Sequence, residues 1–275
     1  MTGIPLPICA ACGVQQGAAP PPAICPICAD ARQFVPEGGQ VWTDFGALGA
    51  SRSITWRAEA AGVWSLRLDP HFAIGQRAFL IERPGGAILW DCLSLLDDAT
   101  RTRIAGMGGL SAIAISHPHY YSAIVEWAQA FDAPVHVHAA DERWLQRRDP
   151  LVRLWEGEAL RLDDEATIIR CGGHFDGAAV LHDGAALGGR GALFSGDTIQ
   201  VVADRRHVSF MYSYPNLVPL GAAAVRRIVA AVRPFAFDAV FGAFPGRTIA
   251  SGGKAAIERS VARYLHAIGS SEEAK

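Results

Sequence analysis

The sequence predicts an α+β protein, a four-layer αββα sandwich in which two sheets pack together and helices cover their outer faces. Three observations predict it. From about residue 40 onward, short apolar runs alternate with turn residues, helical patterns interrupt and close these runs, and the same rhythm occurs twice. A small cysteine-rich segment precedes them. We therefore expect two domains, residues 1–40 and residues 41–275.

Composition excludes several classes of protein. Of 275 residues, 50% are hydrophobic and the formal net charge is -2, so a sizeable core is available and no basic stripe points to nucleic acid. No apolar run approaches the roughly 20 residues that cross a bilayer. The first ten residues lack the charged start and apolar stretch of a secretory signal. We expect a soluble, cytoplasmic protein, and composition leaves its oligomeric state open.

Four cysteines form two CxxC pairs in the first thirty residues: Cys9, Cys12, Cys25 and Cys28. Without a secretory signal, this array favours a structural Zn²⁺ with four thiolate ligands, a zinc-ribbon-like segment. A disulfide pair or a redox CxxC is the alternative. Residues 17–23 offer little to bury, so we expect metal binding to supply the folding free energy. Cys92 and Cys171 are expected to be small core residues.

The first half of the larger domain is expected to be mostly strands. Apolar runs between turn residues predict strands at 54–58, 63–68, 78–82, 87–91, 112–115 and 134–138. Helical patterns predict helices at 96–104 and 122–131, with a short one beginning at Asp141.

The second half repeats this order of elements. Strands are expected at 166–170, 178–182, 192–195 and 238–241, and helices at 221–232 and 254–268. Both halves thus offer a sheet and its own helices.

Candidate functional residues follow predicted strands, where loops carry side chains on a rigid base. His117 and His119 form an HxH pair after the strand at 112–115. His174 lies in a glycine-bracketed turn, Asp197 follows the strand at 192–195, and another glycine turn occupies 241–246. Taken singly, a histidine or a Gly-Asp turn is more often structural, so their order and spacing carry the argument.

That order resembles the metallo-β-lactamase-fold hydrolase superfamily, including glyoxalase II-like proteins. The family has an HxHxDH motif, a mid-chain histidine, an aspartate after a strand and a last histidine near the C-terminus. His117, His119, His174 and Asp197 match in order. The resemblance implies that these four bind metal, and that Asp91 buttresses the HxH loop.

The chain departs from the family pattern at three positions, Tyr121, Ser122 and Phe244. In the family, the residues at these positions complete a second metal site. The resemblance therefore implies one Zn²⁺ or Fe²⁺ in the active site, beside the structural zinc. Asp197 would serve as the fourth ligand or as general base, because three histidines and a water form an open catalytic site.

Aromatic residues supply further candidates. Tyr121 stands where the second metal would be and could donate a hydrogen bond to developing charge, with Tyr120 beside it as a substrate contact. The alternative is that both tyrosines simply pack in the first turn of the following helix. Tyr212, Tyr214 and Asn216 could line the substrate pocket, and Arg205 and Arg206 could contact an anionic group of the substrate. Ordinary packing is the alternative there, and it is the preferred interpretation for three other polar residues, His71, Gln76 and His138.

Three functional hypotheses follow from the resemblance. The first is a metal-dependent hydrolase that uses one metal-activated water on a small ester, thioester or amide-like substrate. The second is a mononuclear non-heme iron oxidoreductase similar to persulfide dioxygenases, with His117, His174 and Asp197 as its ligands. The third is a non-catalytic binding protein. The retention of four ligands argues against the third.

Overall fold

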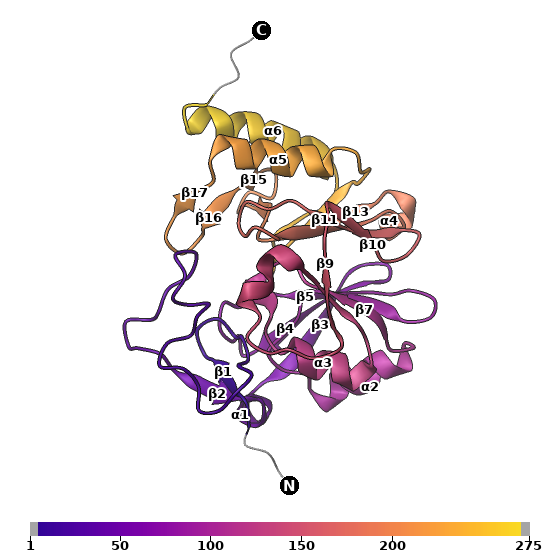
Figure 1. The fold of residues 1–275 in the computed structure, drawn as a ribbon. Coiled ribbons are helices and arrows are strands. Elements are labelled where there is room, and N and C mark those ends of the chain that lie inside the picture. Colours follow the sequence, from indigo (N-terminus) through magenta and orange to yellow (C-terminus); the bar gives the residue numbers. More distant parts are fainter. Residues whose placement is uncertain (1–4, 271–275) are drawn as a thin grey trace. The chain divides into compact units, whose positions relative to one another are not determined.

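The computed structural model describes residues 5–270 (Figure 1). Contacts divide the chain into two compact units that meet in sequence between Trp155 and Glu156. The cysteine-rich segment belongs to the first unit. The expected boundary between residues 40 and 41 stays a prediction, and residues 1–4 of that segment lie outside the described part.

A seven-stranded sheet forms the centre of the first unit, in the order β3-β4-β5-β6-β7-β8-β9. Neighbouring strands are antiparallel from β3 to β6 and parallel from β6 to β9. Every residue of β5 and β6 is buried, which is typical of strands covered on both faces. The strands are β3 (Ser53–Ala60), β4 (Val63–Asp69), β5 (Ala78–Ile81), β6 (Ala87–Trp90), β7 (Leu110–Ala114), β8 (Val135–His138) and β9 (Val152–Trp155).

Helices of the first unit follow its strands. They are α1 (Phe45–Ser51), α2 (Asp98–Gly106), η1 (Pro118–Tyr120), α3 (Ile124–Phe131) and η2 (Ala139–Trp144). Asp97 begins α2 by accepting from the Thr100 amide at 2.8 Å. On α3 the side chains of Ile124, Val125, Trp127 and Ala128 are buried, and the Trp127 indole donates to the Leu93 carbonyl at 3.2 Å.

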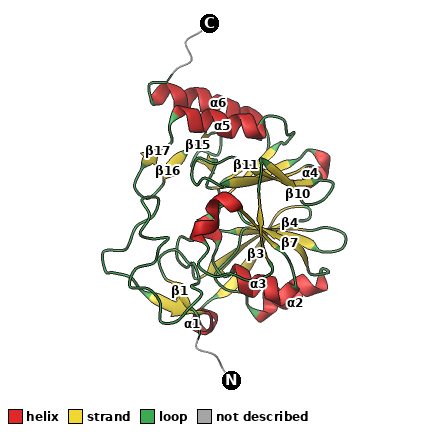
Figure 2. Cartoon of the chain, in the orientation of Figure 1, coloured by secondary structure: helices red, strands yellow, loops and turns green. Residues whose placement is uncertain are grey.

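The cysteine-rich segment is mostly loop (Figure 2). Among its described residues, β1 (Pro7–Cys9) pairs antiparallel with β2 (Trp42–Asp44), and an isolated bridge joins Ile8 to Gln15. Ile8, Val14 and Ile27 are at most 1% exposed, so apolar side chains of the segment are buried within the first unit.

The second unit contains a six-stranded sheet, in the order β10-β11-β12-β13-β18-β19, with only β13 and β18 parallel. Its main strands are β10 (Ala159–Arg161), β11 (Ala166–Arg170), β12 (Ala179–Asp183), β13 (Ala192–Gly196), β18 (Ala239–Gly242) and β19 (Thr248–Ile249). Two long helices, α5 (Ala222–Val232) and α6 (Gly253–Ala267), pack on it and bury Val225, Ile228 and Ile257 in one apolar core.

Short elements join the strands of the second unit. They are α4 (Ala186–Gly189), β14 (Gln200–Val201), β15 (Val208–Ser209), β16 (Met211–Ser213) and β17 (Val218–Pro219). β14 pairs with β15, and β16 pairs with β17. None of these short elements is among the sequence predictions.

Each predicted helix and strand has a counterpart, with boundaries that differ by a few residues. The one change in type is at residues 139–144, where the short helix is a 3₁₀ helix. Cys92 and Cys171 are fully buried, as expected. Within residues 5–270, no helix is long and apolar enough to cross a membrane.

Candidate metal centres

In the first unit, the HxH pair lies on the loop that follows β7. His117 is in extended conformation and η1 begins at the next residue. His117 and His119 are 1% and 3% exposed, and each offers a ring nitrogen within 4.8 Å of the other's. This half of the predicted ligand set is therefore brought together by one loop.

Asp91 holds the start of that loop, as the resemblance implies. It follows β6, the parallel neighbour of β7, and its Oδ1 accepts from the Ser116 amide at 2.7 Å. Its φ is 64°, a left-handed conformation that aspartate tolerates better than most residues. Ser116 Oγ lies 2.8 Å from His117 Nδ1. Asp91, after β6, thus holds the backbone of the loop, and Ser116, after β7, contacts the His117 imidazole.

Gln76 is more closely involved than expected. Its side-chain amide donates to the His119 carbonyl at 3.0 Å, so it holds the second histidine's backbone. A lone glutamine in a loop carries no sequence signal for this contact. His71 is exposed, and His138 packs its ring against Trp155 at 4.4 Å, in line with ordinary packing.

Both tyrosines of the loop donate to backbone carbonyls. Tyr120 donates to Arg77 at 3.0 Å, and Tyr121 donates to Asp141 at 3.2 Å. Burial raises the pKa of Tyr121 well above its usual value, so the phenol stays neutral. These contacts favour the packing interpretation for both residues. The catalytic role of Tyr121 and the substrate contact by Tyr120 stay predictions.

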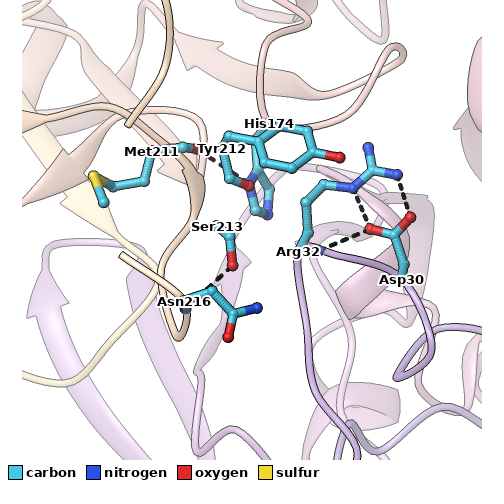
Figure 3. A network of polar contacts seen from close by, with 7 residues as sticks. All are labelled: Asp30, Arg32, His174, Met211, Tyr212, Ser213 and Asn216. Atoms are coloured by element: carbon cyan, nitrogen blue, oxygen red, sulfur yellow. Dashed lines mark hydrogen bonds and ion pairs between the residues drawn. The ribbon is translucent and has the colours of Figure 1, made fainter. Parts of the chain in front are cut away.

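In the second unit, His174 follows β11 and two glycines of positive φ. Its Nδ1 donates to the Tyr212 carbonyl at 2.9 Å and lies 3.3 Å from the Met211 carbonyl (Figure 3). Because two carbonyls can only accept, Nδ1 carries the proton and Nε2 is the nitrogen with a lone pair. The ring is therefore oriented by the backbone of β16.

Asp197 follows β13 and is 6% exposed. Its ligand atom lies within 4.8 Å of that of His174. Tyr214 donates its hydroxyl to the Asp197 carbonyl at 2.8 Å, and its ring lies 5.8 Å from the His174 ring. Burial raises the pKa of Tyr214 well above its usual value, which keeps this donor protonated. Sequence reasoning placed Tyr214 only in the pocket wall.

Other predicted wall residues are less constrained. Tyr212 is half-buried and uses its carbonyl for His174. Asn216 is exposed, and its backbone N–H donates to Ser213 Oγ at 3.3 Å (Figure 3). Their role in substrate binding stays a prediction. Phe244 lies in the turn after β18 and provides no ligand atom.

The four cysteines form a second candidate metal centre, within the first unit. All are buried and free, and their sulfurs lie within 4.8 Å of one another. The Sγ atoms are 3.5 Å apart for Cys9 and Cys28 and 3.7 Å apart for Cys12 and Cys25. Tetrahedral Zn–S bonds of about 2.3 Å place sulfurs about 3.8 Å apart, whereas a disulfide needs about 2.05 Å. The spacing fits a metal and does not fit a disulfide.

Comparisons with known proteins identify a relative by sequence and several structures with a similar fold. No family model matches the chain. It is 43% identical over 271 residues to YmaE of Bacillus subtilis (strain 168), described as an uncharacterized protein, and the match covers 97% of this chain and 98% of YmaE. The chain belongs to the YmaE family.

Solved structures with a similar fold are metallo-β-lactamases. VMB-1 has a TM-score of 0.58 at 14% identity, over 79% of this chain and 99% of that one. FIM-1 from Pseudomonas aeruginosa, in its mono-zinc form, gives 0.56 at 15% identity, over 78% and 96%. The Cronobacter sakazakii enzyme with a HARLDQ motif gives 0.52 at 18% identity, over 82% and 96%. This YmaE relative therefore has the metallo-β-lactamase fold, and the predicted αββα fold class is confirmed.

Proposed function

We propose that this protein is a metal-dependent hydrolase that holds a single metal ion through His117, His119, His174 and Asp197. The observation that carries the proposal is a pair of buried half-sites. One unit offers two imidazole nitrogens within 4.8 Å, and the other offers an imidazole and a carboxylate within the same distance. Neither half has enough ligands alone, and together they supply four.

The donor set fits zinc chemically. Three imidazoles with a water in the remaining position are the usual ligands of a catalytic Zn²⁺. Metal-binding histidines commonly donate their other ring N–H to a carbonyl, which fixes the tautomer. His174 does so toward Tyr212, and His117 has the Ser116 hydroxyl 2.8 Å from its Nδ1.

A bound zinc ion supplies Lewis acidity and brings the pKa of its water to about 7. The chain's own residues would then orient the ligands and accept protons. Asp197 accepts the proton of the attacking water or serves as a fourth ligand, and Tyr214 fixes its backbone. His174 cannot swing out of place while its N–H is bonded to the β16 carbonyl.

A single metal, not a pair, is proposed because three ligands of the second site are replaced. Tyr121 stays neutral and is bonded to Asp141, Ser122 is a poor ligand, and Phe244 is none. FIM-1, whose fold this chain shares, is recorded in a mono-zinc form, so the fold can hold one zinc. The HARLDQ motif of the Cronobacter enzyme likewise departs from HxHxDH.

We further propose a small ester, thioester or amide-like substrate, with Tyr212 and Asn216 along its path. These two side chains remain partly or fully exposed, whereas the hydroxyl of Tyr120 is committed to Arg77. For the four cysteines we propose a second, structural Zn²⁺, on the sulfur spacing described above.

Metal analysis of protein purified without added metal tests the proposal, with wild type, His117→Ala and the control His266→Ala compared. His266 is an exposed histidine on α6, far along the chain from any candidate ligand. We expect two zinc ions per chain in wild type and control, and one in His117→Ala. Wild type should hydrolyse members of a thioester and ester panel, and His117→Ala should lose about 10³-fold or more of that rate.

Two outcomes contradict the proposal. One zinc and one iron, with thiol-dependent oxygen uptake, would indicate the iron oxidoreductase instead. A single zinc that is unchanged in His117→Ala would mean that the histidines hold no metal, which favours a binding protein.

A further inference from the structure

The cysteine-rich N-terminal segment contacts one half of the histidine loop, residues 117–122. That half, Tyr121 and Ser122, departs from the family motif. Gln15 donates its backbone N–H to the Ser122 carbonyl at 2.9 Å. Ser122 is 4% exposed and has a φ of 26°, so its backbone is held in an unusual conformation. Val14 and Gln15 line one small cavity together with Tyr121 and Ser122.

A second contact reaches Tyr121 through η2. Arg32 follows Cys28, the fourth cysteine of the segment. Its side chain is buried, and the guanidinium lies 5.2 Å from the centre of the Trp144 ring. Its Nη2 donates to Asp30 at 2.8 Å, so the guanidinium is held in place (Figure 3). Trp144 ends η2, and Asp141 of η2 accepts from the Tyr121 hydroxyl. The segment thus supports the element on which Tyr121 rests.

A third contact joins the segment to the chain that follows Asp91. The Ser94 hydroxyl donates to the Gly13 carbonyl at 2.7 Å, and Ser94 is 5% exposed. Gly13 lies directly after Cys12 and has a φ of 83°. A Cβ at this position would come within 2.5 Å of Ser94 Oγ, so only glycine permits this approach.

The side chain of Gln15 adds a fourth contact. It accepts from Arg147 at 2.6 Å and donates to Glu126 on α3 at 3.2 Å, while Arg147 bonds Glu126 at 2.6 Å. Gln15 is only 4% exposed, so both of its polar ends are satisfied inside the first unit.

We propose that the N-terminal segment braces the Tyr121–Ser122 half of the histidine loop, so that metal bound by the four cysteines controls how firmly His117 and His119 are held. Two of the three positions that depart from the family pattern, Tyr121 and Ser122, line a small cavity together with Val14 and Gln15 of this segment. The two candidate centres are therefore coupled through Gln15, Arg32 and Ser94.

Part of the test needs no metal at the histidines. Hydrogen exchange of the full-length protein, followed in peptides covering residues 116–124, reports how firmly the loop is held. Cys12→Ser weakens the cysteine site directly. Gly13→Ala keeps all four cysteines and separates the segment from Ser94, and Ser94→Ala removes only the hydroxyl. Ser260→Ala is the matched control, a buried serine of α6 that donates to a backbone carbonyl at 2.6 Å in the second unit.

We expect exchange at 116–124 to accelerate about tenfold or more in Cys12→Ser and Gly13→Ala, less in Ser94→Ala, and not at all in Ser260→Ala. Co²⁺ affinity at the histidine site, read from the visible absorption of the bound ion, should fall about tenfold in Cys12→Ser and Gly13→Ala. It should fall less in Ser94→Ala and not at all in Ser260→Ala. This second measurement rests on the proposed function, whereas the exchange measurement does not.

The proposal is overturned if folded Cys12→Ser protein has lost its thiolate-bound metal and still exchanges at 116–124 as wild type does. If Cys12→Ser fails to fold, wild-type exchange in Gly13→Ala overturns it equally. Should wild type bind no Co²⁺ at the histidines, the hydrolase proposal fails alone, and the exchange rates still decide the brace.

Discussion

The two units hold their candidate ligands in different ways. In the first, His117 and His119 share one loop, and Asp91, Gln76 and the N-terminal segment each hold a different part of it. In the second, His174 and Asp197 follow different strands, yet one stretch, residues 211–214, holds both. The first arrangement spreads the task over several segments, and the second concentrates it on one.

This difference teaches where each half is sensitive. In the first unit, removing one contact leaves the others in place. Only the loss of the most buried contact should therefore lower the free energy of unfolding by much. In the second unit, Tyr214 alone contacts both candidate ligands, through its ring beside His174 and its hydroxyl on the Asp197 backbone carbonyl, so one change there affects both. The predictions below run from the largest expected effect to the smallest.

Asp91→Ala should be the most damaging change to the first unit's loop. It leaves the buried Ser116 amide without its acceptor and forces alanine to adopt a φ of 64°. We expect a loss of about 2–4 kcal/mol in the free energy of unfolding, measured by urea denaturation. Asp91→Asn, which keeps an oxygen acceptor and tolerates this φ, should recover most of it. Equal losses in both variants would contradict the assigned hydrogen bond.

Gly173→Ala makes the corresponding change in the second unit. Gly173 precedes His174 with a φ of 87°, and a Cβ there would lie 2.9 Å from Ile228 Cδ1. We expect a loss of about 1–3 kcal/mol by the same measurement. Gly189→Ala is the control, because its φ is 86° and nothing lies within 4 Å. If the two variants lose the same stability, contact with α5 is not what restricts Gly173.

Tyr214→Phe separates positioning from stability. The variant keeps the ring and removes the donor to the Asp197 carbonyl, at an expected cost of about 1 kcal/mol. Tyr264→Phe should cost about as much, since that hydroxyl donates to the Leu220 carbonyl at 3.0 Å. Only Tyr214→Phe should weaken Co²⁺ binding at the histidine site, by about tenfold. Unchanged affinity would reduce Tyr214 to a packing residue.

Glu126→Gln should have the smallest effect. Its ion pair with Arg147 is partly exposed, at 32% and 19% of the two side chains, so we expect a loss of about 0.5 kcal/mol. The free energy of unfolding is measured by thermal denaturation. A loss above about 2 kcal/mol would show that the position of Gln15 depends on the Glu126–Arg147 pair more than on its other contacts.

The sequence predicted what periodicity and local motifs encode. The long strands, α3, α5 and α6 follow from apolar spacing, and all four candidate ligands stand at strand ends that the pattern marks. The resemblance to the metallo-β-lactamase-fold superfamily also predicts that Asp91 supports the histidine loop. Apolar spacing and strand-end motifs depend on near neighbours in the chain, so a single sequence contains them.

The contacts that hold the ligands were harder to predict. β14 to β17 have two or three residues each, too few for any period to show. The Gln15–Ser122 and Gln76–His119 contacts join residues far apart in sequence, and neither residue type marks such a role. The tyrosine hydroxyls could not be assigned for the same reason, because their acceptors are backbone carbonyls defined only by the fold.

X-ray diffraction from crystals of the full-length protein, recorded on both sides of the zinc and iron absorption edges, tests the central claim most directly. The account predicts two zinc peaks per chain. One should lie among the four cysteine sulfurs, and one should be contacted by His117, His119, His174 and Asp197, with no peak beside Tyr121, Ser122 or Phe244. A pair of peaks at the histidines, an iron peak there, or no peak at all would contradict a single-zinc hydrolase.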